Sequence, residues 1–301
     1  MIIWLASYPK SGNTWLRAFI SSLLYSDDGQ MKGDLWEKID QFPTLKHFDN
    51  LIKDKETLKL KKRDDVTSLF KEFINSQDFI NLDNKIKFLK THFLNCKVDN
   101  YNFTDQKNTL GVIHIVRDPR NVVTSLKNHY DLDDINESYD FLTNDQKWIG
   151  TDMIKESFVP TFISSWSNHY NLWKQSKKNY LLVKYENLIS DTVKEMRLIK
   201  EYIENIMNTK IDEKKFINAV NSTNFENLKK LENDDKFDEN TLNKKNKKIK
   251  FFNLGIKNDW VKILDNKISN KIEKKFENEM KELGYIQFFK SIFLIYHLNL
   301  S

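Results

Sequence analysis

A predicted strand, a tight loop and a predicted helix at the start of the sequence constrain this chain most. The strand covers Ile2–Ala6, and the loop reads Ser7-Tyr8-Pro9-Lys10-Ser11-Gly12-Asn13-Thr14-Trp15. A helix that starts directly after a Gly-containing turn directs several unpaired backbone N–H groups at one place. The sequence therefore predicts an anion-binding loop at the edge of a sheet. Apolar residues at helical spacing mark the helix: Trp15, Leu16, Phe19, Ile20, Leu23 and Leu24.

Three more short apolar runs are typical of buried strands, at residues 87–90, 112–116 and 180–184. They alternate with amphipathic segments, which predicts an α/β fold with a central, mainly parallel sheet flanked by helices, as in P-loop NTPases. Asp118 and Pro119 suit the cap and first position of one helix. Further helices are expected over 162–173, over 193–206 and over 264–280, the last ended by Gly284.

The 301 residues contain no linker rich in Pro, Gly or Ser, which favours one domain over residues 1–301. Two polar stretches, 131–156 and 229–250, are longer than ordinary connections. We expect them to be lids at an acceptor site or mobile loops. The apolar C-terminal segment 288–300 is shorter than the roughly 20 residues of a membrane-spanning helix and is expected to pack as a helix or strand, with a membrane-surface role as the alternative.

The charge balance excludes little by itself, because a net charge of +5 favours anionic ligands only weakly and argues against nucleic acid as a partner. Only five of the 48 basic residues are arginines, so each arginine carries more weight as a candidate anion ligand. The single cysteine, Cys96, excludes an internal disulfide. It fits a reducing compartment, and we expect a cytoplasmic protein without a secretory signal.

The loop departs from the Walker pattern of nucleotide triphosphatases, G-x-x-x-x-G-K-[ST]. Gly12 and Thr14 are in register with that pattern, but Ser7 replaces its first Gly and Asn13 replaces its Lys. The missing Lys is the one that contacts the β- and γ-phosphates in such enzymes. A P-loop kinase of small molecules therefore remains an alternative that the sequence does not favour.

Residues 8–15 resemble the phosphate loop of the cytosolic-type sulfotransferase family, which is close to Tyr-Pro-Lys-Ser-Gly-Thr-Thr-Trp. This family uses 3′-phosphoadenosine 5′-phosphosulfate (PAPS) as a co-substrate, so the resemblance implies a PAPS-dependent sulfotransferase. Lys10 would neutralise the bridging oxygen as the S–O bond breaks, and Trp15 would lie at the adenine or in the core. The residues implied to hold the 5′-phosphosulfate are Lys10, Ser11, Gly12, Asn13, Thr14 and Trp15.

A second segment, Val116-Arg117-Asp118-Pro119-Arg120 through Ser125, resembles the family's site for the 3′-phosphate. There an arginine after a strand and a serine eight residues later hold the phosphate, which implies these roles for Arg117 and Ser125. A forked guanidinium, a hydroxyl and a helix start suit a dianionic phosphate. For Arg120, an ion pair at the helix start is as good an interpretation as a ligand role.

Shorter matches follow in the order expected for the same family. Tyr185 and Thr223 correspond to nucleotide-binding residues, and Gly255 begins a segment similar to the family's late Gly-x-x-Gly-Asp-Trp loop. The chain departs from that loop at Asn253, where the family has Arg, and at Asn258, where it has Gly. Lys248, Lys250 or Lys257 could supply the lost charge.

The segment Lys90-Thr91-His92 after a predicted strand resembles the family's Lys-Thr-His. This implies that His92 is the general base and that Lys90 orients the sulfonate. An imidazole suits proton abstraction at neutral pH. The alternative for His92 is an ordinary core histidine. We expect no metal, since the sequence shows no carboxylate pair to hold one.

The acceptor is the least defined part of the predicted reaction. We expect the hydroxyl or amine of a small molecule or glycan to receive the sulfuryl group, leaving adenosine 3′,5′-bisphosphate. A nucleotide-binding module without turnover is a further alternative, supported by Asn253, and a homodimer is left open. Four aromatic residues are candidates for stacking on an acceptor or for the core: Trp36, Phe42, Phe48 and Trp148.

Overall fold

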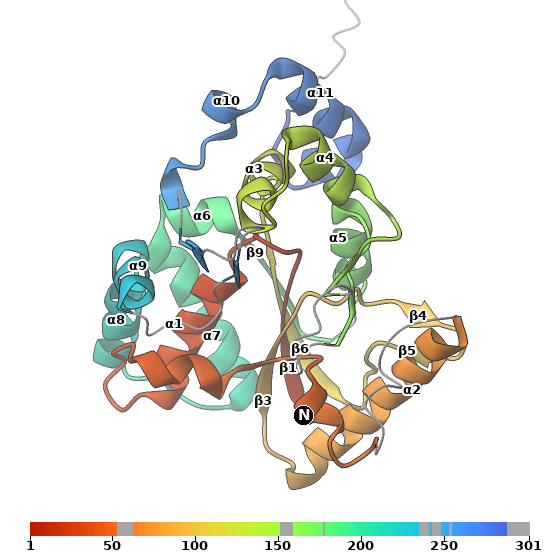
Figure 1. Cartoon of the computed structure of the whole chain (residues 1–301). Coiled ribbons are helices and arrows are strands. Elements are labelled where there is room, and N and C mark those ends of the chain that lie inside the picture. The colour runs from red at the N-terminus through yellow and green to blue at the C-terminus, as the bar shows by residue number, and fades with distance from the viewer. Residues whose placement is uncertain are drawn as a thin grey trace, which may run out of the picture.

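A five-stranded sheet forms the centre of the molecule (Figure 1), in the order β2-β3-β1-β6-β9 with every neighbouring pair parallel. The computed structural model describes residues 1–52, 63–150, 159–176, 178–234, 241–242, 248–252 and 255–287. The strands are β1 (Ile2–Ser7), β2 (Asp40–Gln41), β3 (Lys87–Thr91), β6 (Thr109–Val116) and β9 (Tyr180–Lys184). The expected α/β class and all four expected strands are confirmed, and β2 is an addition at the edge.

Helices cover both faces of the sheet and its carboxyl end. They are α1 (Asn13–Tyr25), α2 (Arg63–Ile80), α3 (Pro119–His129), α4 (Ile135–Thr143), α5 (Trp166–Lys174), α6 (Tyr185–Ser190), α7 (Thr192–Met207), α8 (Glu213–Ser222), α9 (Phe225–Asn233), α10 (Trp260–Ile263), α11 (Asn266–Lys275) and α12 (Glu277–Glu282). Two-residue strands form the hairpins β4–β5 (Lys97–Val98, Tyr101–Asn102), β7–β8 (Trp148–Ile149, Thr161–Phe162) and β10–β11 (Thr241–Leu242, Lys248–Ile249). Among the described residues, no helix is both long and apolar enough to cross a bilayer.

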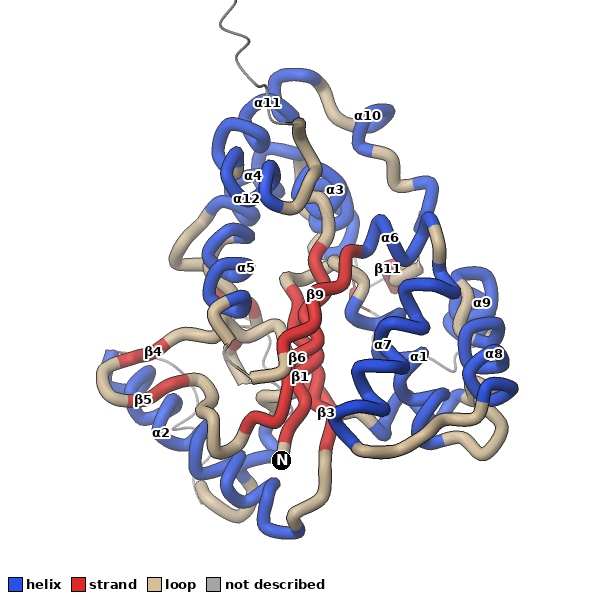
Figure 2. The backbone as a smooth tube through the Cα atoms, turned by 180° about the vertical axis from the view of Figure 1, so that it is seen from behind, coloured by secondary structure: helices blue, strands red, loops and turns tan. Residues whose placement is uncertain are grey.

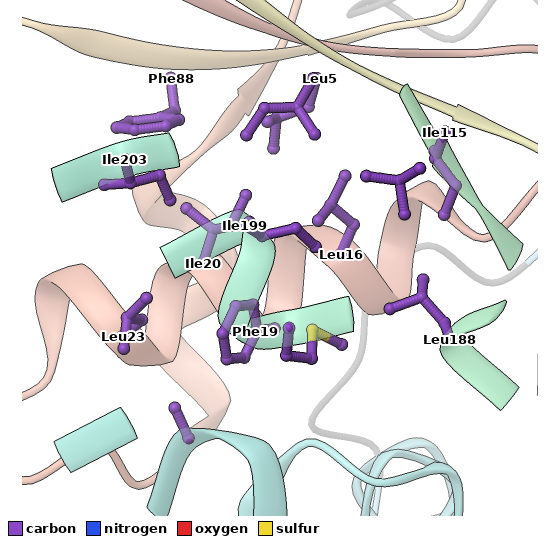
Figure 3. Packing of buried hydrophobic residues seen from close by; sticks show 14 of the residues in the cluster. Leu5, Leu16, Phe19, Ile20, Leu23, Phe88, Ile115, Leu188, Ile199 and Ile203 are labelled. Atoms are coloured by element: carbon purple, nitrogen blue, oxygen red, sulfur yellow. The ribbon is translucent and has the colours of Figure 1, made fainter. Parts of the chain in front are cut away.

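One face of the sheet packs against α1, α7 and α8, which lie together on one side in both views (Figures 1 and 2). The apolar stripe of α1 faces the strands, because residues three and four apart share one side of a helix. Figure 3 shows Leu16 and Ile20 of this stripe beneath Leu5 of β1. This packing fixes the helix whose first turn follows the loop.

The opposite face packs against α2 and α5 through a cluster rich in aromatic rings. Trp4 of β1 lies 5.5 Å from the ring of Phe42 and donates its indole N–H to the Thr109 hydroxyl. Phe42 and Phe48 are fully buried there, and Trp148 stacks on Phe162. Trp36 is buried in a smaller cluster with Ala18. The four aromatic candidates for acceptor stacking thus contribute to packing.

A third group of helices, α3, α4, α11 and α12, covers the carboxyl end of the sheet with α5. Here the structure corrects two expected helix boundaries. Phe162 belongs to β8, and the helix begins at Trp166 after the Ser165 cap. The long helix expected over 264–280 is divided at Phe276 into α11 and α12. Gly284 follows with φ of 72°, as expected for a left-handed stop.

The two polar stretches, 131–156 and 229–250, contain helices and short strands and are not irregular loops throughout their described residues. In the first, α4 begins at the Asp134 cap and packs Phe141 and Leu142 against the helices around it. In the second, α9 continues to Asn233 and the β10–β11 hairpin follows. A lid role for 131–156 or 229–250 stays a prediction, and residues 151–158, 235–240 and 243–247 lie outside the described residues, as does the segment 288–300.

The buried His114 is expected to make the stability of this fold depend on pH. It lies in β6, is 1 % exposed and has Nδ1 2.8 Å from the Tyr180 hydroxyl. Burial lowers its pKa from 6.5 to about 3, and burial also lowers the pKa of the neighbouring His169. The unfolded chain therefore binds more protons below pH 6.5, and stability is lost as the pH falls from there toward about 3. At pH 5, His114 alone is expected to cost about 2 kcal/mol relative to neutral pH.

Urea unfolding at pH 7.5 and pH 5.0 measures this effect. His114→Gln keeps a polar group beside Tyr180 but cannot be protonated, so it should reduce the difference between the two free energies of unfolding by about 2 kcal/mol. An unchanged difference in the variant would show that His114 is not the group that titrates.

Candidate functional site

Four segments that the sequence analysis singled out meet at the carboxyl end of the sheet. Ser7 ends β1, His92 follows β3, Arg117 follows β6 and Tyr185 follows β9. They come together because the strands are parallel and lie in the order β3-β1-β6-β9. The chain leaves β1 toward β3 on one side and later fills the other side with β6. Ligands of open parallel sheets bind at the carboxyl edge where the strand order reverses in this way.

The loop after β1 has the backbone of an anion site. Lys10 and Gly12 have φ of 67° and 102°, which turn the chain sharply into α1 at Asn13. A Cβ at Gly12 would lie 2.5 Å from Cδ2 of the Tyr185 ring, so only glycine fits at this position. Gly12 has no side chain, so it gives the first turn of α1 no side-chain cap.

Among the described loop side chains, that of Asn13 is hydrogen-bonded to the sheet and that of Ser11 is not. Asn13 turns back to the sheet, where its amide donates to the Leu5 carbonyl (2.8 Å) and to Ser7 Oγ (3.0 Å). It fastens the loop to β1, so its backbone N–H is the group that it can offer to an anion. In the part of the chain that the structure describes, the buried Ser11 Oγ has no hydrogen-bond partner. Thr14, at the start of α1, is also buried.

Lys10 lies between two segments that are distant in sequence. Its Nζ is 3.7 Å from the centroid of the Phe251 ring and 3.5 Å from Nδ1 of His129, the last residue of α3. A lysine over an aromatic face is stabilised by the ring quadrupole. The charge of the loop is thus held at the point where α3 and the segment before Gly255 meet.

Arg117 connects the loop to α3. Its Nη1 donates to the Lys10 carbonyl at 3.0 Å and to Ser125 Oγ at 3.3 Å. Its guanidinium carbon lies 4.2 Å from the centroid of the Tyr185 ring. Within the described residues, its buried Nε has no hydrogen-bond partner. The structure therefore brings Arg117 and Ser125 together, as the resemblance implies.

Arg120 is an ion-pair residue and not part of this cluster. Its guanidinium bonds both carboxylate oxygens of Asp118, the carboxylate of Glu273 and the Tyr285 carbonyl, and its central carbon lies 3.9 Å from the centroid of the Trp260 ring. These partners use its donors inside the protein. Of the two interpretations of Arg120, the structure supports the ion pair, which ties α3 to the C-terminal helices.

The position of the proton on His92 follows from its hydrogen bonds. Nδ1 lies 2.8 Å from the Ser7 carbonyl and 3.1 Å from Ser7 Oγ. A carbonyl oxygen only accepts hydrogen bonds, so Nδ1 carries the hydrogen and Nε2 holds the free electron pair. His92 as a whole is half-buried. Lys90, two residues earlier in β3, is 4 % exposed, and its predicted role stays a prediction.

Of the residues predicted to contact the adenine or the rest of the nucleotide, Trp15 and Tyr185 are in contact with each other beside the loop. Their rings meet edge to face with centroids 6.1 Å apart. Thr223 donates its hydroxyl to the Ala219 carbonyl at 2.7 Å, so it also caps the end of α8. Gly255 has φ of 53°, and a Cβ there would lie 2.4 Å from the Phe225 ring. Asn253 lies outside the described residues.

Two neighbours of the cluster were not identified as site residues from the sequence. Phe251 belongs to no motif, and its contact with Lys10 exists only in the folded chain. His129 ends α3 one turn after Ser125, and its contact with Lys10 likewise joins segments that are far apart in the sequence. Within the described ranges, no group of three or more His, Cys, Asp or Glu side chains could hold a metal ion.

Comparisons with known proteins show the family and the fold of this chain. A family model described as the sulfotransferase domain matches residues 2–284. The mouse sulfotransferase SULT7A1, solved in complex with PAP, is 19% identical with a TM-score of 0.56, over 94% of this chain and 86% of that one. Retinol dehydratase, solved with retinol and PAP, is 15% identical with a TM-score of 0.54, over 93% and 81%. These structures share the fold. A search of curated proteins found no match.

Proposed function

This chain belongs to the sulfotransferase domain family, and we propose that it transfers a sulfuryl group from PAPS to an acceptor. The acceptor group is a hydroxyl or amine of a small molecule or glycan. The second product is adenosine 3′,5′-bisphosphate (PAP). PAPS carries anionic groups at two positions of one ribose, so its site must offer two neighbouring groups of donors.

The position of Arg117 carries this proposal. One nitrogen of its guanidinium contacts both the backbone of the loop, at Lys10, and the hydroxyl of Ser125 on α3. The loop suits the 5′-phosphosulfate and the Arg117–Ser125 pair suits the 3′-phosphate. Because Arg117 touches both, the two proposed subsites are neighbours, as the two anionic groups of PAPS are.

The buried donors of the site fit such a ligand. In the described part of the chain, Ser11 Oγ and Arg117 Nε are buried without hydrogen-bond partners. A buried polar group left unpaired costs about 1–3 kcal/mol, which anionic oxygens would offset. The rings of Trp15 and Tyr185 beside the loop offer apolar surface for a purine.

The chemistry follows from the positions of His92 and Lys10. Nε2 of His92 takes the proton of the acceptor hydroxyl or amine, and the acceptor atom attacks the sulfur of PAPS. The bond between sulfur and the phosphate oxygen breaks, and the negative charge that develops on this oxygen is stabilised by Lys10 and by the N–H groups at the start of α1.

Binding of the product nucleotide tests the donor half of the proposal. PAP at a hundredfold excess over its dissociation constant is expected to raise the melting temperature by about 5 °C. Arg117→Met should remove most of this shift, whereas Arg197→Met is the matched control, since Arg197 pairs with Glu213 at the surface. A shift with ATP and magnesium but none with PAP would favour the kinase alternative.

Measurement of turnover tests whether the chain transfers the sulfuryl group to an acceptor. Incubation with PAPS and panels of phenols, alcohols, amines and glycans is expected to give an acceptor whose mass increases by one SO3. PAPS that stays intact with every class, despite tight binding of PAP, would favour the module without turnover.

We propose the cytoplasm as the compartment of this reaction. Cys96 is the only cysteine of the chain, and burial raises the pKa of its thiol to about 12, so it is a poor nucleophile. A chain with no disulfide suits the cytoplasm. Assembly into a homodimer stays a prediction.

A further inference from the structure

Asn258 lies against the proposed 3′-phosphate residues, although no role was expected for it. It follows the short helical turn Gly255–Lys257 and is 7 % exposed. Its side-chain amide contacts three groups of α3: the Asn121 carbonyl at 2.9 Å, Ser125 Oγ at 3.1 Å and Thr124 Oγ1 at 2.7 Å. The segment before α10 is therefore fastened to the helix that carries Ser125.

The orientation of this amide follows from its partners. A backbone carbonyl only accepts hydrogen bonds, so the amide nitrogen of Asn258 must face the Asn121 carbonyl. The same nitrogen lies 3.1 Å from Ser125 Oγ, and the amide oxygen lies beside Thr124 Oγ1. Asn258 is thus a hydrogen-bond donor to Ser125.

This orientation determines what Ser125 can do. Its oxygen accepts from Arg117 Nη1 at 3.3 Å and from Asn258 Nδ2 at 3.1 Å. A hydroxyl oxygen accepts two hydrogen bonds and carries one hydrogen. With two donors facing the oxygen, the hydrogen must point away from both. Ser125 is then a donor with a fixed direction, and an anion is the partner that suits such a donor best.

We propose that Asn258 is a specificity-determining, positioning residue for the 3′-phosphate of the donor nucleotide. It acts through Ser125, because its amide occupies one acceptor site of the hydroxyl and so orders the hydrogen toward the phosphate. This inference rests on the proposed function and deepens it. Asn258 is thus expected to favour nucleotides that carry a 3′-phosphate over nucleotides that lack one. Its amide is neutral and faces Ser125, so it affects binding only through that hydroxyl.

Titration calorimetry with two nucleotides measures the discrimination directly. The wild type is expected to bind PAP much more tightly than adenosine 5′-monophosphate, which lacks the 3′-phosphate. Asn258→Ala should weaken the binding of PAP by about tenfold or more, because a hydrogen bond to a charged group is involved. The binding of the monophosphate should change by less than about threefold, because it has no 3′-phosphate for the Ser125 hydroxyl to contact. An equal loss for both nucleotides would show a merely structural role and overturn the inference.

A double-mutant cycle tests whether Asn258 acts through Ser125. In a Ser125→Ala background, Asn258→Ala should have little further effect on the affinity for PAP. The same loss in both backgrounds contradicts the proposed route. Thr124→Val is the matched control, because it removes the partner of the amide oxygen and leaves the donor to Ser125 in place. It should keep the ratio of the two affinities.

The melting temperature without nucleotide shows whether each variant is folded. If Asn258→Ala is not, Asn258→Ser removes the same amide donor with a smaller loss of side-chain volume, and the same ratio decides. A wild type that binds the two nucleotides equally would contradict the proposed 3′-phosphate site itself. A wild type that discriminates, with variants that keep its ratio, would contradict only the role of Asn258.

Discussion

His92→Gln is expected to lower the turnover number by about 10²–10⁴-fold, the usual contribution of a positioned general base. The bond from His92 Nδ1 to the Ser7 carbonyl leaves the electron pair on Nε2, and a glutamine amide has no basic nitrogen. Turnover is measured as sulfated acceptor formed at saturating PAPS. The affinity for PAP should stay within about threefold, since the base acts on the acceptor rather than on the nucleotide.

His47→Gln is the matched control for this variant. His47 lies in the short helix Leu45–Phe48 and bonds Thr44, and burial lowers its pKa to about 4. It lies outside the proposed site, so its replacement should leave turnover at neutral pH unchanged. A His92→Gln enzyme with wild-type turnover would remove His92 from the mechanism and restore the interpretation of an ordinary structural histidine.

Lys10→Met should lower turnover by about 10²–10³-fold, the range for loss of one group that stabilises developing charge. Methionine has a similar length and apolar stem, so it can still pack on Phe251, but it carries no charge. In the proposed mechanism, the interaction of Lys10 with the leaving oxygen strengthens as the S–O bond breaks. The loss is therefore expected in kcat, measured at saturating PAPS and acceptor, and to a lesser degree in nucleotide affinity.

Lys107→Met provides the same substitution at an exposed position. The side chain of Lys107 is 73% exposed and pairs with Asp78, so turnover should not change. If Lys10→Met weakens nucleotide binding but keeps wild-type kcat, Lys10 contributes to ground-state binding alone, and its assignment to the leaving oxygen is wrong.

The central part of the fold could be predicted from the sequence because buried parallel strands are continuous apolar runs. Ile2–Ser7 and Thr109–Val116 are such runs, and both lie in the core of the sheet. The strand Asp40–Gln41 has two residues of ordinary polar composition, so no pattern could indicate it. Its position depends on pairing with β3, which is a tertiary property.

Helix boundaries were harder to predict where apolar spacing continued across a break. Phe162 fits the helical spacing of Trp166 and Tyr170, but its backbone pairs with β7, and the helix starts only after Ser165 caps it. Phe276 also continues an apolar repeat, although it lies between α11 and α12. In both places the ring packs against a hydrophobic cluster, so the apolar spacing continues although the helix does not.

The site shows the same division between local and tertiary information. The loop, Arg117 and Ser125 could be found because each lies in a contiguous motif next to a strand. The contact of Lys10 with Phe251 and the contact of Asn258 with Ser125 join segments more than 130 residues apart. Such contacts depend on how α3 and the C-terminal helices pack, which no local motif encodes.

The contact between Gly12 and Tyr185 has a consequence for engineering the donor specificity. The ring of Tyr185 fills the space that a side chain at Gly12 would need, and Arg117 lies on the same ring. In the proposed site, a purine pocket enlarged by shifting this ring would also disturb the turn that we propose to bind the phosphosulfate. Because only glycine fits at position 12 and the Tyr185 ring packs directly on it, room for a PAPS analogue with a bulky base must come from positions other than 12 and 185.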